Sequence, residues 1–385
     1  MKIVMLSNFL NHHQLSLCQE LARLTDNNFY FIAIEKMPEE RRLLGYQNYT
    51  DFPFFIQYTE EKKKLIESLI IESDALICGS VPDSFFVPRV KARKLTFRYS
   101  ERVFKTPFTI KNTLHRIGSM LVHFIRYQNQ TQYLLCASAF TALDISRFGC
   151  FHNRLYKWGY FPEAKKYEEM TDLISRKKHN SILWCGRMID WKHPEAAVEL
   201  AKRLRNSNFS FTLDFIGIGD LENRLRKFVQ NEGLDDFVHF HCSMTPDEVR
   251  EYMENASIYL MTSNRREGWG AVVNEAMNSG CAVVGSHIVG SIPYLIQDKK
   301  NGLIYRSGDM EDLYSKVVYL LEHPEKRKQI GLEAYRTITG LWNAETAAQR
   351  FVNVCSHILN GEKSPDLYEF GPCSKAEIIK NNYYN

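Results

Sequence analysis

Residues 263–280 read SNRREGWGAVVNEAMNSG, and they join a glycine-rich loop to the start of a helix. The run before it, SIYLMT (257–262), has the composition of a buried strand. After the loop, apolar residues recur at helical spacing, at Val272, Val273, Ala276 and Met277. A strand, a short loop and a helix form the repeating unit of parallel α/β sheets. The stretch therefore predicts a Rossmann-like domain whose loop lies at the carboxyl end of a strand, where such sheets bind ligands.

The same alternation runs along the whole chain and predicts two domains. Strands are expected at 2–6, 28–34, 74–80, 94–100, 132–138, 181–187, 211–217, 237–242 and 281–286. A polar, charged segment from 161 to 180 interrupts the rhythm. We predict an α/β fold of two Rossmann-like domains facing across a cleft. Residues 1–165 form the first, 166–345 the second, and 346–385 a C-terminal helix that could cross back to the first domain, with a polar tail.

Composition narrows the class of protein. The 385 residues are 44% hydrophobic and 24% charged, the balance of a globular protein. No apolar run approaches the roughly 20 residues that span a bilayer, and MKIVMLSNF is too short for a signal peptide. Nine cysteines occur singly, without C-x-x-C or zinc-ligand spacing, as is typical of a reducing compartment. We expect a cytoplasmic protein with no nucleic-acid partner.

Basic residues gather in the predicted first domain. They are densest in PRVKARKLTFRYSERVFK (88–105), and the predicted helix 109–127 is both basic and amphipathic. Two interpretations are open for each stretch. The helix could pack on the core and the charges could be solvated, or the surface could bind an anionic partner. That anionic partner is either a phosphorylated substrate or an acidic lipid, and the lipid predicts peripheral contact with the inner face of a membrane.

Two glutamates mark a candidate site in the opening stretch. Glu267 lies on the loop and Glu275 lies in the first part of the helix. Unpaired N–H groups and the helix dipole make a helix start a natural site for anions. Gly268 and Gly270 let the backbone approach a ligand closely, and each carboxylate can accept two hydroxyl hydrogen bonds. This pattern suits a nucleoside diphosphate sugar; the alternative is two solvent-exposed glutamates.

A second candidate segment is CGRMIDWKHPE (185–195), which follows the first predicted strand of the second domain. Arg187 offers a planar fork for phosphate oxygens and Lys192 a compact charge. The alternative is two ordinary surface cations. DFIGIGDLENRL (214–225) lacks the third glycine of a dinucleotide turn, so a nicotinamide site is not predicted, and the chain has no P-loop.

Five signatures occur in order: G-R-x4-K, F-I-G-x-G-D, H-C-S-M-T-P-D-E-V, E-G-W-G-A-V-V-N-E-A-M-N-S-G and V-G-S-I-P-Y-L-I-x-D-x-K-N-G-L-I-Y. Over about 180–345 this order resembles the donor-binding domain of retaining glycosyltransferases of family 4, which have the GT-B fold. The resemblance implies a UDP- or GDP-sugar donor. It assigns catalytic roles to Glu267, Arg187 and Lys192.

The resemblance also implies which residue holds each part of the donor. Arg187 and Lys192 would hold the diphosphate, Glu275 the ribose and Glu267 the transferred sugar. Backbone donors would come from Gly268, Trp269 and Gly270. No D-x-D occurs, which fits a metal-independent member of the family, and no cofactor is expected.

The chain departs from the family pattern at several places. The first turn, SNFLNHHQ (7–14), has no glycine, so His12 and His13 become candidates for acceptor contact; the alternative is a helix start with polar caps. Glu101 and Arg102, in TFRYSER (96–102), are further acceptor candidates. His193 stands where the family typically has glycine, and Tyr294 where it usually has glutamate.

We therefore predict a retaining hexosyltransferase that acts on a polysaccharide or lipid-linked glycan. Two alternatives remain: a nucleotide-sugar-binding regulatory protein without turnover, and a GT-B epimerase or hydrolase.

Overall fold

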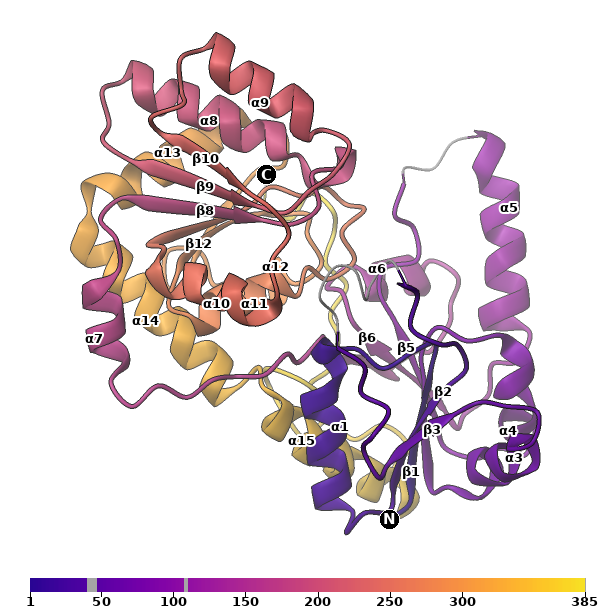
Figure 1. Cartoon of the computed structure of the whole chain (residues 1–385). Helices are drawn as coiled ribbons and strands as arrows, with labels where there is room; N and C mark the ends of the chain where they lie inside the picture. Colours follow the sequence, from indigo (N-terminus) through magenta and orange to yellow (C-terminus); the bar gives the residue numbers. More distant parts are fainter. Residues whose placement is uncertain (40–46, 107–109, 385) are drawn as a thin grey trace. The chain divides into compact units, whose positions relative to one another are not determined.

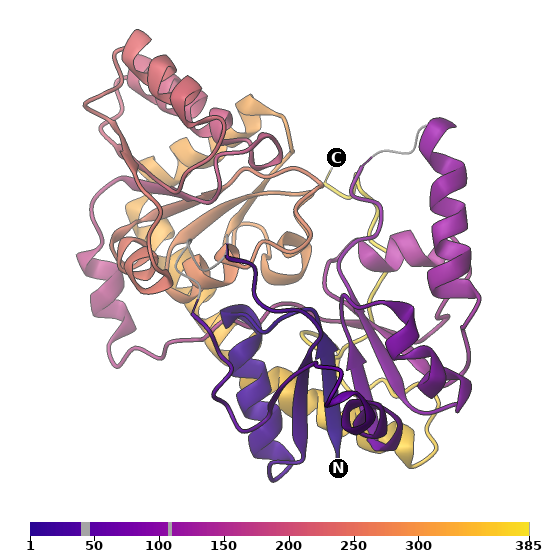
Figure 2. The ribbon, with the colours of Figure 1, turned by 45° about the vertical axis from the view of Figure 1, so that its right-hand side comes forward.

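The computed structural model describes the chain except residues 40–46, 107–109 and 385, and it divides the chain into two compact units (Figures 1 and 2). The first unit holds Met1–Glu163 and Trp342–Lys380. The second holds Ala164–Leu341 and Asn381–Asn385. Each unit is an α/β domain built on one parallel sheet, as the strand–helix alternation predicts.

The sheet of the first unit has the strand order β3-β2-β1-β4-β5-β6-β7, with every pair parallel. Its strands are β1 (Ile3–Ser7), β2 (Phe29–Ala33), β3 (Phe55–Gln57), β4 (Ala75–Cys78), β5 (Thr96–Ser100), β6 (Gln132–Cys136) and β7 (Leu155–Lys157). The order reverses between β1 and β4, which is the switch point where such sheets open a crevice for ligands.

Helices cover both faces of this sheet (Figure 1). They are α1 (His12–Leu24), α3 (Lys63–Glu72), α4 (Val87–Lys91), α5 (Ile110–Met120) and α6 (Thr141–Ser146), with a 3-10 turn at Asp83–Phe85. The long helix predicted at 109–127 is α5 followed by a π-helical turn, Leu121–Ile125. A π-helical turn breaks the 3.6-residue period, so the side chains beyond α5 face directions that helical spacing does not predict.

The C-terminal helix α15 (Ala344–Leu359) packs beside α1 in the first unit (Figure 1). The ring of Phe351 lies 4.8 Å from that of Phe97 on β5. As far as Lys380, the polar tail, to which the sequence assigns no fold, is anchored to the same unit without regular structure. Tyr156 donates a hydrogen bond of 2.8 Å to the carbonyl of Pro365.

The sheet of the second unit has the parallel order β10-β9-β8-β11-β12-β13. Its strands are β8 (Ser181–Cys185), β9 (Thr212–Ile216), β10 (Val238–His241), β11 (Ile258–Met261), β12 (Ala282–Ser286) and β13 (Leu303–Tyr305). Its helices are α7 (Met170–Arg176), α8 (Pro194–Asn206), α9 (Glu222–Asn231), α10 (Pro246–Asn255), α11 (Val272–Asn278), α12 (Ile292–Leu295), α13 (Met310–Glu322) and α14 (Pro324–Gly340). In the described residues, no helix is long and apolar enough to cross a membrane.

Candidate functional site

Lys192 and Glu267, far apart in the sequence, form an ion pair in the second unit. Lys192 ends a 3-10 turn, Asp190–Lys192, in the loop after β8, and Glu267 lies in the loop after β11. The Nζ atom of Lys192 contacts Oε2 of Glu267, and their side chains are 16% and 15% exposed. Ser263 donates a hydrogen bond of 3.3 Å to the same carboxylate oxygen. The structure thus brings together a predicted phosphate ligand and a predicted sugar ligand.

Hydrogen bonds hold these two loops side by side. The hydroxyl of Thr262 donates to the carbonyl of Lys192 over 2.7 Å and accepts a bond of 2.8 Å from the indole N–H of Trp184. The backbone N–H of Asn264 donates to the carbonyl of Trp191 over 2.9 Å. Because these bonds use buried strand-end residues, the positions of Lys192 and Glu267 are set by the sheet.

His193 adds a side-chain link that the sequence did not predict. Its backbone is left-handed, with φ of 48°, at the residue before α8. Only glycine adopts this conformation at little cost, which explains why glycine is typical at this position. The imidazole Nδ1 lies 2.6 Å from a carboxylate oxygen of Glu195, and Nε2 accepts from the amide of Asn264 over 2.9 Å. The hydrogen bond with Glu195 raises the pKa of His193.

Two glycines let the loops after β8 and β9 meet backbone to backbone. A Cβ atom at Gly217, where φ is 125°, would lie 2.2 Å from the carbonyl oxygen of Gly186. A Cβ atom at Gly219 would lie 2.4 Å from the carbonyl oxygen of Met188. The G-x-G pattern is therefore a tight turn that supports the loop carrying Arg187 and Lys192, as its missing third glycine suggests.

Arg187 is exposed, and its guanidinium carbon lies 5.7 Å from the ring centre of Trp191. Arg266 lies over the same ring at 4.4 Å. A guanidinium beside a tryptophan ring keeps its N–H groups open to a second partner at its edge. Arg187 is thus on the same loop as Lys192 but outside the ion pair with Glu267.

The Gly268-Trp269-Gly270 segment, which continues the loop after Glu267, is buried. The side chain of Trp269 is 0% exposed and donates from Nε1 to the amide oxygen of Asn274 over 2.9 Å. Gly270 has φ of 86°, and a Cβ atom there would lie 2.6 Å from the end of Met261. The Trp269 ring therefore belongs to the core, and only backbone groups of this segment are available for the predicted role.

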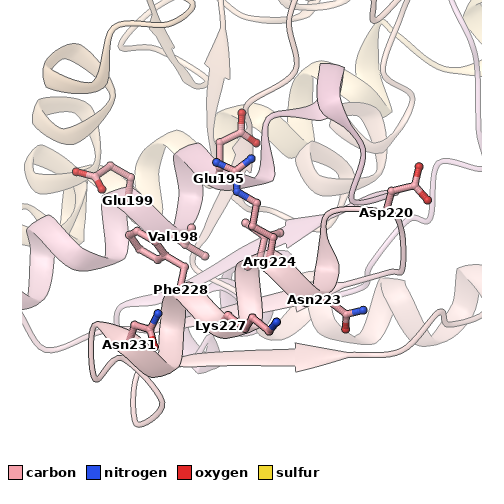
Figure 3. A pocket seen from close by; sticks show the side chains of 10 residues that line it. Glu195, Val198, Glu199, Asp220, Asn223, Arg224, Lys227, Phe228 and Asn231 are labelled. Carbon is pink, nitrogen blue, oxygen red and sulfur yellow. The ribbon is translucent and has the colours of Figure 1, made fainter.

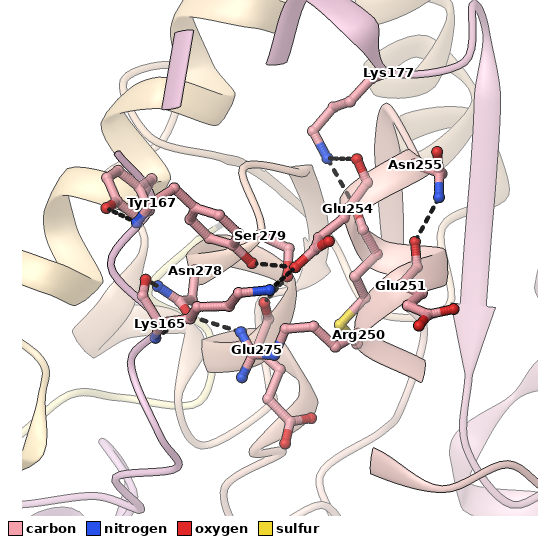
Figure 4. A network of polar contacts seen from close by, with 12 residues as sticks. Lys165, Tyr167, Lys177, Arg250, Glu251, Glu254, Asn255, Glu275, Asn278 and Ser279 are labelled. Carbon is pink, nitrogen blue, oxygen red and sulfur yellow. Dashed lines mark hydrogen bonds and ion pairs between the residues drawn. The ribbon is translucent and has the colours of Figure 1, made fainter. Parts of the chain in front are cut away.

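Glu275 lies in α11, and Figure 4 shows its carboxyl pointing away from the ion pairs around Lys165. Burial raises the pKa of Glu275 to about 7, although the charge of Arg250 opposes this shift. Arg250 is itself held by a bond of 2.6 Å to the amide oxygen of Asn278. Burial also raises the pKa of Cys185, to about 12; the charge of Glu275 adds to this shift and the charge of Lys192 opposes it.

The same network anchors the start of the second unit to α10 and α11 (Figure 4). Lys165 and Tyr167 contact one carboxylate oxygen of Glu254 at 2.8 and 2.6 Å. The backbone N–H of Lys165 donates to Asn278 over 2.9 Å, and the Asn278 amide returns a bond of 3.0 Å to the Lys165 carbonyl. These contacts fix α11, and with it the backbone from which Glu275 projects.

A groove of about 750 Å³ lies between α8 and α9 in the second unit. Figure 3 shows Glu195 and Arg224 near each other above it, with Phe228 and Lys227 from α9 along its side. Glu195 is the residue that binds His193. The hydrogen bond between Glu195 and His193 therefore links a residue that lines the groove to the loop that carries Lys192.

Within the first unit, Glu101 lines a pocket of about 540 Å³ at the carboxyl ends of β1, β4 and β5. Its carboxylate accepts a hydrogen bond of 2.9 Å from the hydroxyl of Tyr160 and pairs with Lys105 at 2.7 Å. This is the position that a parallel sheet gives to ligand contacts.

Arg102 has a different environment from the one expected. Its side chain is 0% exposed, pairs with the buried Asp144 at 3.7 Å and lies 4.8 Å from the ring centre of Phe140. Asp144 also accepts a bond of 2.9 Å from the backbone N–H of Phe104. Arg102 nevertheless lines the same pocket as Glu101, so its contact with an acceptor stays a prediction.

His12 and His13 form the first turn of α1, and the side chain of Asn11 caps the helix by accepting from the N–H of His13 over 3.0 Å. The two rings lie 3.7 Å apart between centres. The polar helix start, left open as an alternative above, therefore accounts for the backbone here, and contact of either ring with an acceptor stays a prediction.

Part of the chain is similar to a known family of proteins. Residues 165–337 match the family model for glycosyl transferases group 1. The amylovoran biosynthesis glycosyltransferase AmsK of Erwinia amylovora is 26% identical over 46% of this chain and 44% of its own length. The trehalose synthase of Pyrococcus horikoshii is 31% identical over 46% of this chain and 44% of its own. The matched region thus spans less than half the length of these relatives.

Among solved structures, Anabaena Alr3699/HepE in complex with UDP aligns with a TM-score of 0.69 at 15% identity, over 92% of this chain and 100% of that one. At that identity the likeness establishes architecture, and both parallel-sheet units take part in it. The chain therefore has the two-domain GT-B fold, and its residues 165–337 are similar to the glycosyl transferases group 1 family.

Proposed function

We propose that the protein is a retaining, metal-independent glycosyltransferase. It moves a hexosyl unit from a UDP- or GDP-sugar onto a polysaccharide or lipid-linked glycan. The observation that carries the proposal is the ion pair of Lys192 and Glu267 at the ends of β8 and β11, in the domain that matches the family. A phosphate-binding cation and a hydroxyl-binding anion held together are what a nucleotide sugar needs at its diphosphate–sugar junction.

The ion pair suggests how the site responds to the donor. When the diphosphate binds, its oxygens replace Glu267 as partners of Lys192, and Arg187 adds a second cation. The released carboxylate of Glu267 then accepts hydroxyls of the sugar, beside the backbone of Gly268 and Gly270. Glu275 accepts the ribose hydroxyls. Binding of the donor diphosphate thereby frees Glu267 to bind the sugar in the same step.

Family resemblance supplies the proposed chemistry of transfer. The acceptor hydroxyl attacks the anomeric carbon on the face that the diphosphate leaves. A new C–O bond forms as the bond to the phosphate oxygen breaks, and the departing phosphate takes the acceptor proton. Lys192 and Arg187 neutralise the charge that develops on the leaving group, which is the role that fixed cations can fill in place of a metal.

Named relatives support the choice of donor and acceptor class. AmsK is described as an enzyme of amylovoran biosynthesis, and HepE has been crystallised with UDP and with UDP-glucose. A UDP-sugar is therefore the first donor to test, and a bacterial polysaccharide the first acceptor.

The decisive experiment incubates the protein with UDP- and GDP-sugars, with and without glycan acceptors, and measures free nucleotide and the anomeric configuration of the product. We expect acceptor-dependent nucleotide release, retained configuration and insensitivity to EDTA. Lys192→Ala should abolish release, whereas Lys202→Ala, which removes an ordinary lysine paired with Glu232 in the same unit, should not. Tight binding without release would identify a regulatory protein. Release into water alone would identify a hydrolase, and strict dependence on a divalent metal would refute the mechanism.

We further propose that α5 and the following turn dock on an anionic membrane, as suits a lipid-linked acceptor. Leu114, Ile117, Leu121 and Val122 are 80%, 39%, 49% and 47% exposed, so these apolar side chains are not packed in the core. The exposed Arg126 lies at the end of this stripe. Apolar side chains beside basic ones fit an anionic lipid surface.

Vesicle flotation tests the docking proposal. We expect binding to vesicles of phosphatidylglycerol and phosphatidylcholine, weaker binding to phosphatidylcholine alone, and at least a tenfold loss in a Leu114→Ser, Leu121→Ser variant. Leu65→Ser, at an exposed leucine of α3, serves as the matched control. Equal binding of both variants would refute the docking surface.

A further inference from the structure

The pocket in the first unit is polar and has an unusual arginine in its wall. Its lining comes from the ends of β1, β4 and β5, from the 3-10 turn after β4, and from the π-helical turn after α5. Arg98, the third residue of β5, is part of that lining. Every lining residue belongs to the first unit, so the pocket is a property of that unit alone.

Three neighbours hold the guanidinium of Arg98. Its carbon lies 4.6 Å from the ring centre of Phe86 and 4.6 Å from that of Phe124, so the cation contacts two aromatic rings. One terminal nitrogen donates a hydrogen bond to the carbonyl of His123. Contacts of this kind restrain a guanidinium and leave N–H groups at its edge able to donate to a further partner.

A π-helical turn supplies two of these three contacts. Both His123 and Phe124 belong to Leu121–Ile125, the turn that interrupts the regular helix. Such turns are uncommon and are often found at functional sites. The backbone irregularity that the sequence pattern could not predict is therefore what positions Arg98.

Arg98 has no carboxylate partner. Within the described part of the chain, no carboxylate oxygen lies within 4 Å of its nitrogens, and His123 accepts its one hydrogen bond. Arg98 is partly buried, and burial lowers its pKa. Asp83 lies near enough to act on this charge, but its carboxylate is 2.8 Å from the imidazole of His123. A partly buried cation without an ion pair is costly unless a ligand supplies the anion.

The rest of the lining suits the hydroxyls of a sugar. The Glu101 carboxylate is matched by Lys105 and Tyr160, so it contributes acceptor oxygens without an excess negative charge. Ser7 and Asn8 at the end of β1 add a hydroxyl and an amide. The other two cations of the lining, Arg102 and Lys105, are paired with Asp144 and Glu101. Arg98 is therefore the cation of this lining best placed to distinguish a sugar that carries an acidic group from a neutral one.

We propose that this pocket binds an acidic sugar, with the edge of the Arg98 guanidinium pairing with the carboxylate or phosphate group of that sugar. Resting on the proposed function, the acidic sugar is the acceptor end of the glycan. A planar carboxylate and a phosphate both accept two parallel hydrogen bonds from arginine, so the two sources share one chemistry at this site.

Binding to the full chain without nucleotide tests the site directly. The probes are methyl glucuronide, glucose 6-phosphate and the neutral methyl glucoside. The affinity of each probe is measured by calorimetry or by NMR of the ligand. We expect at least one acidic sugar to bind ten times more tightly than the glucoside or better, and the tighter of the two identifies the carboxylate or the phosphate as the source. Equal affinity of all three sugars would overturn the proposal.

Variants attribute the preference to Arg98. Arg98→Gln should bind acidic and neutral sugars equally, whereas Arg23→Gln, which removes an exposed arginine of α1 paired with Glu20, should keep the preference. Circular dichroism establishes that each variant is folded. The comparison of acidic with neutral sugars on the wild-type protein tests the site even if a variant does not fold. A folded Arg98→Gln that retains the preference would overturn the assignment.

The two proposals fail in different ways. If acidic sugars bind but no donor supports transfer, the proposed function is wrong while the site stands. If transfer occurs but acidic and neutral acceptors bind alike, the site is wrong while the function stands. A transfer assay with acidic and neutral acceptors, run beside the binding measurement, distinguishes these results.

Discussion

Replacing Glu267 with glutamine should separate its structural partnership with Lys192 from its role at the sugar. The pair is mostly buried, with side chains 16% and 15% exposed. Breaking a fully buried pair costs about 3–5 kcal/mol, and an exposed pair contributes about 0–1 kcal/mol. We therefore expect Glu267→Gln to lower the free energy of unfolding of the second unit by about 2 kcal/mol. In a unit of this size that corresponds to a fall in Tm of about 4–8 °C, measurable by calorimetry.

The same change should leave nucleotide affinity intact. In the variant, Lys192 has no carboxylate to give up when the diphosphate arrives, so UDP should bind as tightly as to the wild type or more tightly. Transfer should nevertheless fall by about 100-fold or more, since a charge-assisted contact that strengthens in the transition state is lost. Calorimetric titration with UDP and the nucleotide-release assay measure the two effects separately.

A matched control isolates the site from the general cost of removing a charge. Glu232 pairs with Lys202 at 2.9 Å in the same unit, with side chains 33% and 30% exposed. Glu232→Gln should lower the free energy of unfolding by no more than about 1 kcal/mol, with a correspondingly small change in Tm. It should not affect transfer. The reasoning fails if Glu267→Gln weakens UDP binding tenfold or leaves the rate of transfer within threefold of the wild type.

Three further predictions follow from burial and packing. Because the pKa of Glu275 is raised to about 7, its carboxyl is protonated below that pH. The affinity for a nucleotide sugar should therefore rise from pH 6 to pH 8. Glu275→Gln should bind the nucleotide sugar weakly at both pH values, and titration calorimetry measures each affinity. Gly219→Ala should destabilise the second unit by about 2 kcal/mol or more, since its Cβ meets the backbone, whereas Gly340→Ala, with nothing within 4 Å, should not lower Tm. Arg102→Met should cost about 3–5 kcal/mol by removing the cation that pairs with the buried Asp144, and Arg102→Met with Asp144→Leu should recover most of that loss in denaturant unfolding.

Periodicity predicts the longer strands of both sheets, because buried parallel strands are short apolar runs that few other elements imitate. It does not predict the three-residue strands β3, β7 and β13, which are too short to show a pattern. Predicted strand 181–187 is β8 at Ser181–Cys185, and predicted strand 94–100 is β5 at Thr96–Ser100. The C-terminal tail was not predictable. Its anchors are single contacts to distant segments, such as Tyr156 to Pro365, and single contacts leave no repeating pattern.

Residue chemistry identified candidate ligands better than it identified their supports. The pairing of Lys192 with Glu267 joins two residues that motif spacing had singled out. His193 had been noted only as a departure from glycine. Its left-handed backbone and its bonds to Glu195 and Asn264 depend on two other loops, and loop positions are not encoded in local sequence.

The segment TFRYSER shows most clearly why charge alone does not reveal function. It contains two arginines four positions apart, Arg98 and Arg102, which are chemically equivalent in the sequence. Arg102 meets a buried Asp144 after β6, so its charge has a partner inside the unit. Arg98 meets two aromatic rings and a backbone carbonyl, which is why we propose that a ligand supplies its anion. The two environments differ through the carboxylate that each arginine has or lacks, and that carboxylate comes from elsewhere in the chain.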